Sequence, residues 1–272
     1  MNILVTAGNT RTMIDRVRCI TNVFTGRTGA NIAAEAARRG HAVTLLTSHP
    51  DVLPPTPGLT VLPYQTFEEL ALLMAQGIRG GSFDAVIHSA AVSDYHVAGV
   101  FASGDKPTTA VDTVGLLARR ASEGPTASED TQQGTGGGEP TDLSTERLAP
   151  RSRVGLTDVS AGKVRSSHPE LWLRLTPAPK LVDKVRAEWG FRGVLVKFKL
   201  EVGVSEAELR DIAERSRLHS HADLMSANTL DGAAEWALVG AGDYTKVPRA
   251  NLAAEIVSRV EVLHEPRPRG SG

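Results

Sequence analysis

Apolar runs of strand length alternate along the chain with segments whose apolar residues recur every three or four positions. "NILVT" (2–6) is a continuous apolar run, and Ile32, Ala33 and Ala36 share one face of the following segment 29–39. Such runs are typical of strands buried on both faces of a parallel sheet, and the helical spacing predicts covering helices. This pattern predicts strands at 2–6, 42–47, 59–64, 83–92, 171–175, 193–200, 223–228 and 235–240, and helices at 29–39, 66–78, 179–188, 205–218 and 250–263.

Local signals fix several ends of these elements. Thr66 with Glu69 three residues later forms a capping box at a helix start, and Gly40 is placed to end the helix 29–39. The alternation predicts an α/β protein with a three-layer, Rossmann-like, doubly wound and mainly parallel sheet in a single domain, residues 1–263. Ligands of such sheets bind beyond the carboxyl ends of the strands, so the loops after Thr6 and His88 should share one edge.

One long segment breaks the pattern. Residues 122–149 contain no aromatic residue, no Val and no Ile. A segment of this composition cannot bury enough apolar surface to offset its ordering entropy. We therefore predict a largely disordered insertion or flap region at 102–161, with a short helix at 109–121, and a frayed tail at 264–272.

Composition narrows the possible partners and location. The 272 residues are 41% hydrophobic and 22% charged, with a formal net charge of -1. This balance gives no general attraction to nucleic acid or to an anionic membrane. The single cysteine, Cys19, excludes an intramolecular disulfide and fits a reducing cytosol. No apolar run approaches a membrane span and no signal peptide is visible, so we expect a cytoplasmic protein.

A polar stretch of about twenty residues separates the first strand from the following helix pattern. Gly26 and Gly29 flank the start of a helix, where backbone N–H groups and the helix dipole would accept a phosphate or a carboxylate. An ordinary helix start in a solvated loop would look the same. The number of polar side chains between the two glycine segments favours an anionic ligand; they include Arg11, Asp15, Arg18, Asn22 and Arg27.

Further candidates lie in later loops. Ser89, Ala90 and Ala91 are small enough for a flat ring to lie against their backbone, and Asp94 follows them. Taken alone, Asp94 is an ordinary turn residue and Lys163 an ordinary solvated lysine. The chain lacks G-x-G-x-x-G, H-E-x-x-H, G-x-S-x-G, a P-loop and a Cys/His metal cluster.

In their order, six segments resemble those of phosphopantothenoylcysteine synthetase, a ligase of coenzyme A biosynthesis. They are "TAGNTRTMIDRVRCITNVFTGRTGANIA", "AAVSDY", "GKVRSS", "PKLVDKV", "VKFKLE" and "DLMSAN". Each motif is weak, but their order is specific, and the resemblance covers the chain apart from 102–161 and the tail.

The resemblance implies a nucleotide-dependent ligase that joins 4′-phosphopantothenate to L-cysteine through an acyl-nucleotide intermediate. It implies ATP or CTP with Mg²⁺ as co-substrate, metal ligands being unknown, and a homodimer. A separate phosphopantothenoylcysteine decarboxylase would act next. Because the chain starts at the synthetase, we expect no FMN.

The resemblance also implies roles for individual residues. Asn22, Arg18 and Lys163 are expected to be catalytic, with Asn22 at the acyl group and Lys163 on a flap that meets the phosphates. Phosphopantothenate-binding residues would be Arg18, Asn22, Gly26 and Gly29. Nucleotide-binding residues would be Gly8, Thr10, Ser89, Ala90, Ala91, Asp94, Lys163, Pro179, Lys180, Leu181, Val182 and Phe198.

The sequence departs from the family pattern in four ways. Asn9 replaces a usual second glycine, Val202 replaces a usual threonine, and Ser216 and Ser220 stand where bacterial members carry two lysines. The interval between Asp94 and Lys163 is also unusually long. Loss of the two lysines weakens the case for CTP, the bacterial nucleotide, and favours ATP.

Two other interpretations remain open at this point. A non-catalytic nucleotide-binding homologue would keep the fold, its flap disabled by the insertion, but retention of Arg18, Asn22 and Lys163 argues against it. A Rossmann-type reductase is disfavoured by the missing dinucleotide fingerprint.

Overall fold

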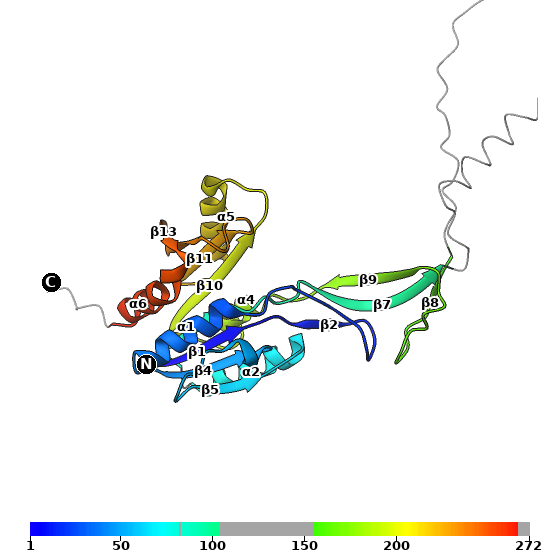
Figure 1. Ribbon diagram of the computed structural model, residues 1–272, viewed down its shortest axis with the longest axis horizontal. Coiled ribbons are helices and arrows are strands. Elements are labelled where there is room, and N and C mark those ends of the chain that lie inside the picture. Colours follow the sequence, from blue (N-terminus) through cyan, green and yellow to red (C-terminus); the bar gives the residue numbers. More distant parts are fainter. Residues whose placement is uncertain (82, 104–154, 266–272) are drawn as a thin grey trace, which may run out of the picture. The chain divides into compact units, whose positions relative to one another are not determined.

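The computed structural model describes residues 1–81, 83–103 and 155–265 (Figure 1). The chain forms two compact units, which are described separately. The larger unit comprises Met1–Val97 and Leu175–Gly272, and the smaller one comprises Ala98–Arg174. The single domain expected from the sequence, residues 1–263, stays a prediction.

An eight-stranded sheet forms the centre of the larger unit. β1 pairs in parallel with β4 and β6, β6 with β10, β10 with β11, and β4 with β5, whereas β12 is antiparallel to both β11 and β13. The predicted mainly parallel sheet is therefore confirmed. The spatial order is β13 (Asp243–Pro248), β12 (Trp236–Ala241), β11 (Leu224–Thr229), β10 (Val194–Glu201), β6 (Ala85–His88), β1 (Asn2–Ala7), β4 (Ala42–Thr47) and β5 (Thr60–Pro63).

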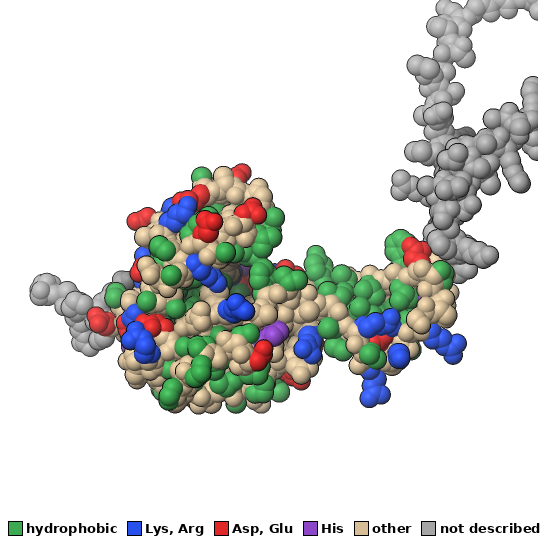
Figure 2. Space-filling model, in the orientation of Figure 1, with side chains coloured by type: hydrophobic (Ala, Val, Ile, Leu, Met, Phe, Trp, Pro, Cys, Tyr) green, Lys and Arg blue, Asp and Glu red, His purple; other side chains and the backbone are tan. Residues whose placement is uncertain are grey.

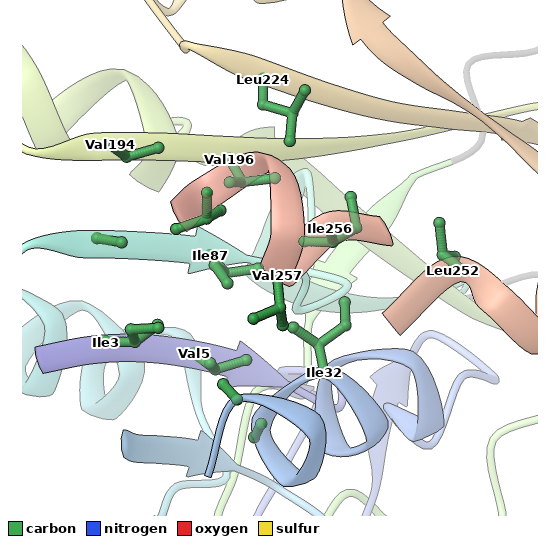
Figure 3. Packing of buried hydrophobic residues seen from close by; sticks show 14 of the residues in the cluster. Ile3, Val5, Ile32, Ile87, Val194, Val196, Leu224, Leu252, Ile256 and Val257 are labelled. Atoms are coloured by element: carbon green, nitrogen blue, oxygen red, sulfur yellow. The ribbon is translucent and has the colours of Figure 1, made fainter. Parts of the chain in front are cut away.

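Helices cover both faces of this sheet, which completes the predicted three layers. On one face, Ile3 and Val5 of β1 pack against Ile32, and Val194 and Val196 of β10 lie toward the same layer of helices (Figure 3). On the other face, Leu4, Val86 and Leu195 meet a second set of helices. The first layer consists of α1 (Arg27–Arg38) and α6 (Leu252–His264), and the second of α2 (Phe67–Arg79), α4 (Leu181–Ala187) and α5 (Glu206–His219).

The local signals read from the sequence are also present. Thr66 accepts the Glu69 N–H and Glu69 accepts the Thr66 N–H, which is the predicted capping box of α2. Gly40 follows the α1 C-cap residue with φ of 89°, a left-handed conformation that favours glycine. Five strands were not predicted; they are β2 (Arg11–Met13), β3 (Cys19–Thr21), β7 (Tyr95–Ser103), β8 (Leu156–Asp158) and β13.

The smaller unit contains β8 and the adjoining parts of β7 and β9 (Leu171–Pro177), in a three-stranded sheet of order β8-β7-β9. Ser103 of β7 pairs with Leu156 of β8 in an antiparallel register. Strand structure therefore extends into both flanks of the predicted insertion 102–161. Residues 104–154, the predicted helix 109–121 and the tail 266–272 lie outside the described residues. Within the described part of the chain, no helix is long and apolar enough to cross a membrane.

Candidate functional site

Two loops meet at the carboxyl ends of neighbouring strands. β1 has β4 on one side and β6 on the other, so the chain leaves β1 and β6 at a point where the strand order reverses. The Ala91 N–H donates to the Gly8 carbonyl at 2.8 Å, and the Thr10 N–H donates to the Ala91 carbonyl at 3.3 Å. The prediction that the loops after Thr6 and His88 share one edge is confirmed, and a crevice at such a reversal is the usual ligand position.

Glycines allow the start of α1 to approach the end of β1. Gly26, the N-cap of α1, has φ of 85°, and a Cβ there would lie 2.0 Å from the Gly8 nitrogen. A Cβ on Gly29 would lie 2.7 Å from the Ala7 Cβ. Any larger residue at either position would push the first turn of α1 away from this edge of the sheet.

Between β1 and α1 the chain forms a short hairpin. β2 pairs antiparallel with β3, and the loop between them is organised by Asp15. Asp15 is buried and accepts the backbone N–H groups of Val17 and Arg18, both at 2.8 Å. The Arg18 guanidinium donates two hydrogen bonds, of 2.5 and 3.0 Å, to the second carboxylate oxygen of Asp15. The half-exposed Arg18 side chain is therefore fixed in direction by a buried carboxylate.

Asn22 joins the hairpin to the loop after β6. Its side-chain amide donates to the Ala91 carbonyl at 2.9 Å. Its own carbonyl accepts the Asn9 side-chain amide at 2.6 Å, and the Asn9 N–H donates to the Ser48 hydroxyl at 2.9 Å. The family departure at Asn9 thus has a visible consequence: Asn9 supplies a side-chain tie to Asn22 that glycine cannot make.

A cavity of about 260 Å³ opens between these segments. It brings together Asn22 and Asp94, which are distant in the sequence but were both predicted as site residues. A larger cavity, of about 790 Å³, lies over the outer face of α1 and contains none of the predicted site residues. The smaller cavity is lined by Thr12, Ile20, Asn22, Val92, Ser93, Asp94, Tyr95 and Leu175.

Hydrogen bonds to Thr6 of β1 hold the turn Ser89–Ala91 in place. The Ala90 N–H donates to the Thr6 hydroxyl at 3.1 Å, and the Ser89 N–H donates to the Thr6 carbonyl at 3.2 Å. Thr10, predicted to contact nucleotide, is fully buried, and its hydroxyl accepts the Ser93 N–H at 2.8 Å. These contacts make the backbone of the turn rigid where a flat ring would lie.

The start of α4 reaches the same loop. Lys180 forms an ion pair with Asp94, and the Ala178 N–H donates to the Asp94 carbonyl at 2.8 Å. Pro179 and Lys180 are exposed, whereas Leu181 and Val182 are buried in the core beneath α4. Phe198 lies on the opposite face of the sheet, against the layer of α1 and α6.

Lys163 belongs to the smaller unit. It is exposed, and the neighbouring Val164 is buried. Lys163 stays a predicted flap residue.

The charges around the site are mixed. Figure 2 shows basic and acidic side chains interspersed over the visible face of the larger unit. Burial, reinforced by the charge of Lys197, lowers the pKa of His88 to about 4, so this imidazole is neutral at physiological pH. Among the described residues, no group of three or more His, Cys, Asp or Glu side chains is placed to hold a metal ion.

Comparison with known proteins agrees with this geometry. Residues 1–115 match the family described as the DNA/pantothenate metabolism flavoprotein C-terminal domain. The coenzyme A biosynthesis bifunctional protein CoaBC of Thermococcus kodakarensis is 30% identical over 268 residues, which are 96% of this chain and 51% of that protein. The CoaBC of Escherichia coli K12 is 40% identical over 100 residues, covering 37% of this chain and 24% of that protein. The chain spans about half the length, or less, of these relatives.

Solved structures show the same fold. The DNA/pantothenate metabolism flavoprotein from Streptococcus pneumoniae has a TM-score of 0.69 and 26% identity, covering 96% of this chain and 99% of that one. A Cab2 mutant in complex with phosphopantothenate-cysteine has a TM-score of 0.60 and 16% identity, covering 97% of this chain and 86% of that one. At that identity the second likeness concerns the fold alone.

The α/β fold, the sheet edge shared by the loops after β1 and β6, and the match of residues 1–115 indicate a class of protein. The chain is similar to the C-terminal domain of the pantothenate-metabolism flavoproteins. Within that class, these comparisons confirm the resemblance to phosphopantothenoylcysteine synthetase that was read from the six segments.

Three residues of the site were not predicted from the sequence. Thr6 is a strand residue whose hydroxyl holds the turn after β6. Asn9 was recognised only as a departure from glycine, and Asp15 only as one of several polar loop residues. An Asp three residues before an Arg is a usable local signal, because a short loop brings the two side chains close enough to form an ion pair. The hydrogen bonds of Thr6 and Asn9 join residues far apart in the sequence, so no local pattern indicates them.

Proposed function

We propose that the protein is a phosphopantothenate–cysteine ligase, which joins 4′-phosphopantothenate to L-cysteine through an acyl-nucleotide. The observation that carries the proposal is the cavity that brings Asn22 and Asp94 together between the loops after β1 and β6, in a chain that resembles this family. A non-catalytic homologue would not need to keep the Arg18 guanidinium oriented by Asp15.

The reaction has two steps. The phosphopantothenate carboxylate attacks the α-phosphorus of the triphosphate, and pyrophosphate leaves. The cysteine amine then attacks the acyl carbon, loses a proton and expels the nucleoside monophosphate as the amide forms. Both steps depend on positioning and on stabilisation of developing negative charge, and the proposal assigns these tasks to the hairpin and the turn after β6.

The proposal assigns parts of the site to each substrate. The exposed, oriented Arg18 guanidinium and the first turn of α1 after Gly26 are suited to the anionic groups of phosphopantothenate. The rigid turn Ser89–Ala91 and the start of α4 are suited to the nucleotide. Lys163 would meet the phosphates, and Mg²⁺ would enter as its complex with the triphosphate.

Direct conversion tests the proposal. Incubation of the protein with phosphopantothenate, cysteine and Mg²⁺ plus a triphosphate should yield phosphopantothenoylcysteine and pyrophosphate, detected by mass spectrometry. Absence of product with every triphosphate, from protein that still binds nucleotide, would leave the non-catalytic homologue as the better description. The homodimer, the separate decarboxylase as the next enzyme and the cytoplasmic location stay predictions.

We predict that ATP is used at least as well as CTP. The positions of the two lysines found in bacterial members carry Ser216 and Ser220, which lack a side-chain cation. Initial rates with ATP, CTP, GTP and UTP at equal concentration measure the preference. Strict dependence on CTP would contradict the prediction.

We predict that Asp15→Asn raises the KM for phosphopantothenate about tenfold, with the KM for nucleotide nearly unchanged. The amide would present an N–H group toward the Arg18 guanidinium, also a donor, so Arg18 would lose its fixed direction. Steady-state kinetics with each substrate varied in turn would separate the two constants, and Asp211→Asn on α5 serves as a matched control. Equal rises in both constants would show a general loosening of the loop instead.

A further inference from the structure

Five polar residues form a cluster between the sheet and the helices α4 and α5, named here the buried polar cluster although only three of them are fully buried and Lys197 and Asp183 are half-buried. His88 at the end of β6 and Lys197 of β10 are partners in the parallel register of these strands. Hydroxyl groups adjoin them on either side. The cluster consists of Thr6, His88, Lys197, Ser220 and Asp183.

The first half of the cluster supports the turn after β6. The Thr6 oxygen accepts the Ala90 N–H, so its own hydrogen is free to point to the His88 Nδ1, which lies 2.9 Å away. An Nδ1 that accepts this hydrogen is unprotonated, and the ring proton of the neutral imidazole then lies on Nε2. Burial and the charge of Lys197 lower the pKa of His88, so the ring is neutral at physiological pH in either tautomer.

The second half supports the start of α4. The Lys197 ammonium donates to the Ser216 carbonyl at 3.0 Å and to the Ser220 hydroxyl. The Ser220 hydroxyl in turn donates to an Asp183 carboxylate oxygen at 2.6 Å. Asp183 lies in the first turn of α4, and this helix begins directly after the exposed residues Pro179 and Lys180.

Stability alone does not account for this arrangement. Among the described residues, Lys197 makes no ion pair within 4 Å, and burial lowers its pKa although the charge of Asp183 partly opposes that shift. A half-buried ammonium held mainly by neutral oxygens costs desolvation free energy that an apolar side chain of similar length would not. What the cluster does provide is a defined geometry, because the Thr6 and Ser220 hydroxyls each link two partners, and the Ser220 hydroxyl lies closer to Asp183, at 2.6 Å, than to the Ser216 carbonyl, at 3.3 Å.

We propose that the buried polar cluster fixes the turn Ser89–Ala91 and the start of α4 relative to each other, and that Lys197 and His88 are positioning residues for nucleotide binding. The inference rests on the proposed function, in which the turn Ser89–Ala91 and the start of α4 bind the nucleotide. It adds that two residues from inside the fold, which need not touch the nucleotide, determine its affinity.

The first test compares Lys197→Met with Lys184→Met, a lysine of the same helix layer that contacts Glu188 outside the cluster. We expect Lys197→Met to raise the KM for ATP about tenfold and to leave the KM for phosphopantothenate within about twofold. Lys184→Met should change neither. Ser220→Ala is a smaller change and should also raise the KM for ATP. It replaces Lys197→Met in the test if that variant does not fold. The inference would be overturned if the KM for ATP were unchanged in every folded variant of the cluster. An equal change in the KM for ATP and the KM for phosphopantothenate would also overturn it.

The second test does not depend on turnover. Nitrogen-15 NMR of the imidazoles in the parent protein at pH 7 should show His88 neutral with its proton on Nε2, and a proton on Nδ1 would overturn the assignment. If the parent forms no product, the proposed function fails. The inference is then tested separately by calorimetric titration, which measures the affinity of the parent and of Lys197→Met for ATP. Tenfold weaker binding by Lys197→Met than by the parent would support it; equal binding, or no binding by the parent, would overturn it.

Discussion

Lys163→Ala is expected to slow pyrophosphate release by a factor on the order of 10²–10³. Negative charge accumulates on the departing pyrophosphate as the phosphopantothenate carboxylate attacks, and an ammonium near those oxygens stabilises the transition state more than the ground state. Since the second step follows departure of pyrophosphate, product formation should fall by the same factor.

The surroundings of Lys163 fit a side chain that is free to act on a ligand. Lys163 is exposed, and none of the ion pairs between described residues includes it. Buried Val164, directly after it, anchors the backbone. A substitution at 163 should therefore change the chemistry and leave the fold intact.

Arg165→Ala is the matched control, because Arg165 is also exposed, basic and only two residues away. Rapid-quench measurement of pyrophosphate should show a normal rate for this control and a slow rate for Lys163→Ala. If both variants release pyrophosphate at the parental rate, Lys163 has no part in the first step. If both are equally slow, a general basic surface rather than one ammonium is responsible.

The larger features of the fold follow from strong, repeated signals in the sequence. β1 and β6 are continuous apolar runs that lie in the middle of the sheet, and α1 and α2 carry clear apolar faces with a glycine stop and a capping box. These elements were predicted to within a few residues. The hairpin β2–β3 was not, because "RTM" and "CIT" are three residues long and mostly exposed, and show no alternation.

The candidate site was predictable only in part, for a related reason. Asn22 and Asp94 were identified through the resemblance, and the structure does bring them to one cavity. The ties that hold this cavity in shape join residues 13 to 84 positions apart, as between Asn9 and Asn22 or Thr6 and Ala90. Such contacts depend on strand order and register, which no local pattern contains. Leu181 and Val182 are buried in the core, and their contact with nucleotide stays a prediction.

The expected role of Asn22 can now be stated in terms of its contacts. One hydrogen of its side-chain amide goes to the Ala91 carbonyl, which leaves a second N–H for a ligand. In the proposed reaction that N–H is directed at the acyl oxygen. This oxygen gains most negative charge when the cysteine amine adds and a tetrahedral centre forms, so the donor helps the second step more than the first.

Asn22→Asp is therefore expected to activate phosphopantothenate but to stall before amide formation, so that acyl-nucleotide accumulates on the enzyme. The carboxylate keeps the size of the amide but replaces its donor with negative charge, which repels the developing oxyanion. Loss of the bond to Ala91 is a smaller effect, because the Ala91 carbonyl still accepts the Thr10 N–H. The second step should slow by a factor on the order of 10²–10³.

Asn9→Ala separates this chemical role from loop shape. It removes the tie to the Asn22 carbonyl and leaves the Asn22 amide in place, so loosening of the loop should slow both steps of that variant by similar factors. Quenched single-turnover samples, with pyrophosphate, acyl-nucleotide and phosphopantothenoylcysteine counted separately, distinguish the two variants. Trapped acyl-nucleotide in Asn22→Asp but not in Asn9→Ala would establish Asn22 as a donor to the acyl oxygen. If instead the two variants behave alike, with pyrophosphate and product falling together and no intermediate, Asn22 acts only by shaping the loop between β3 and α1.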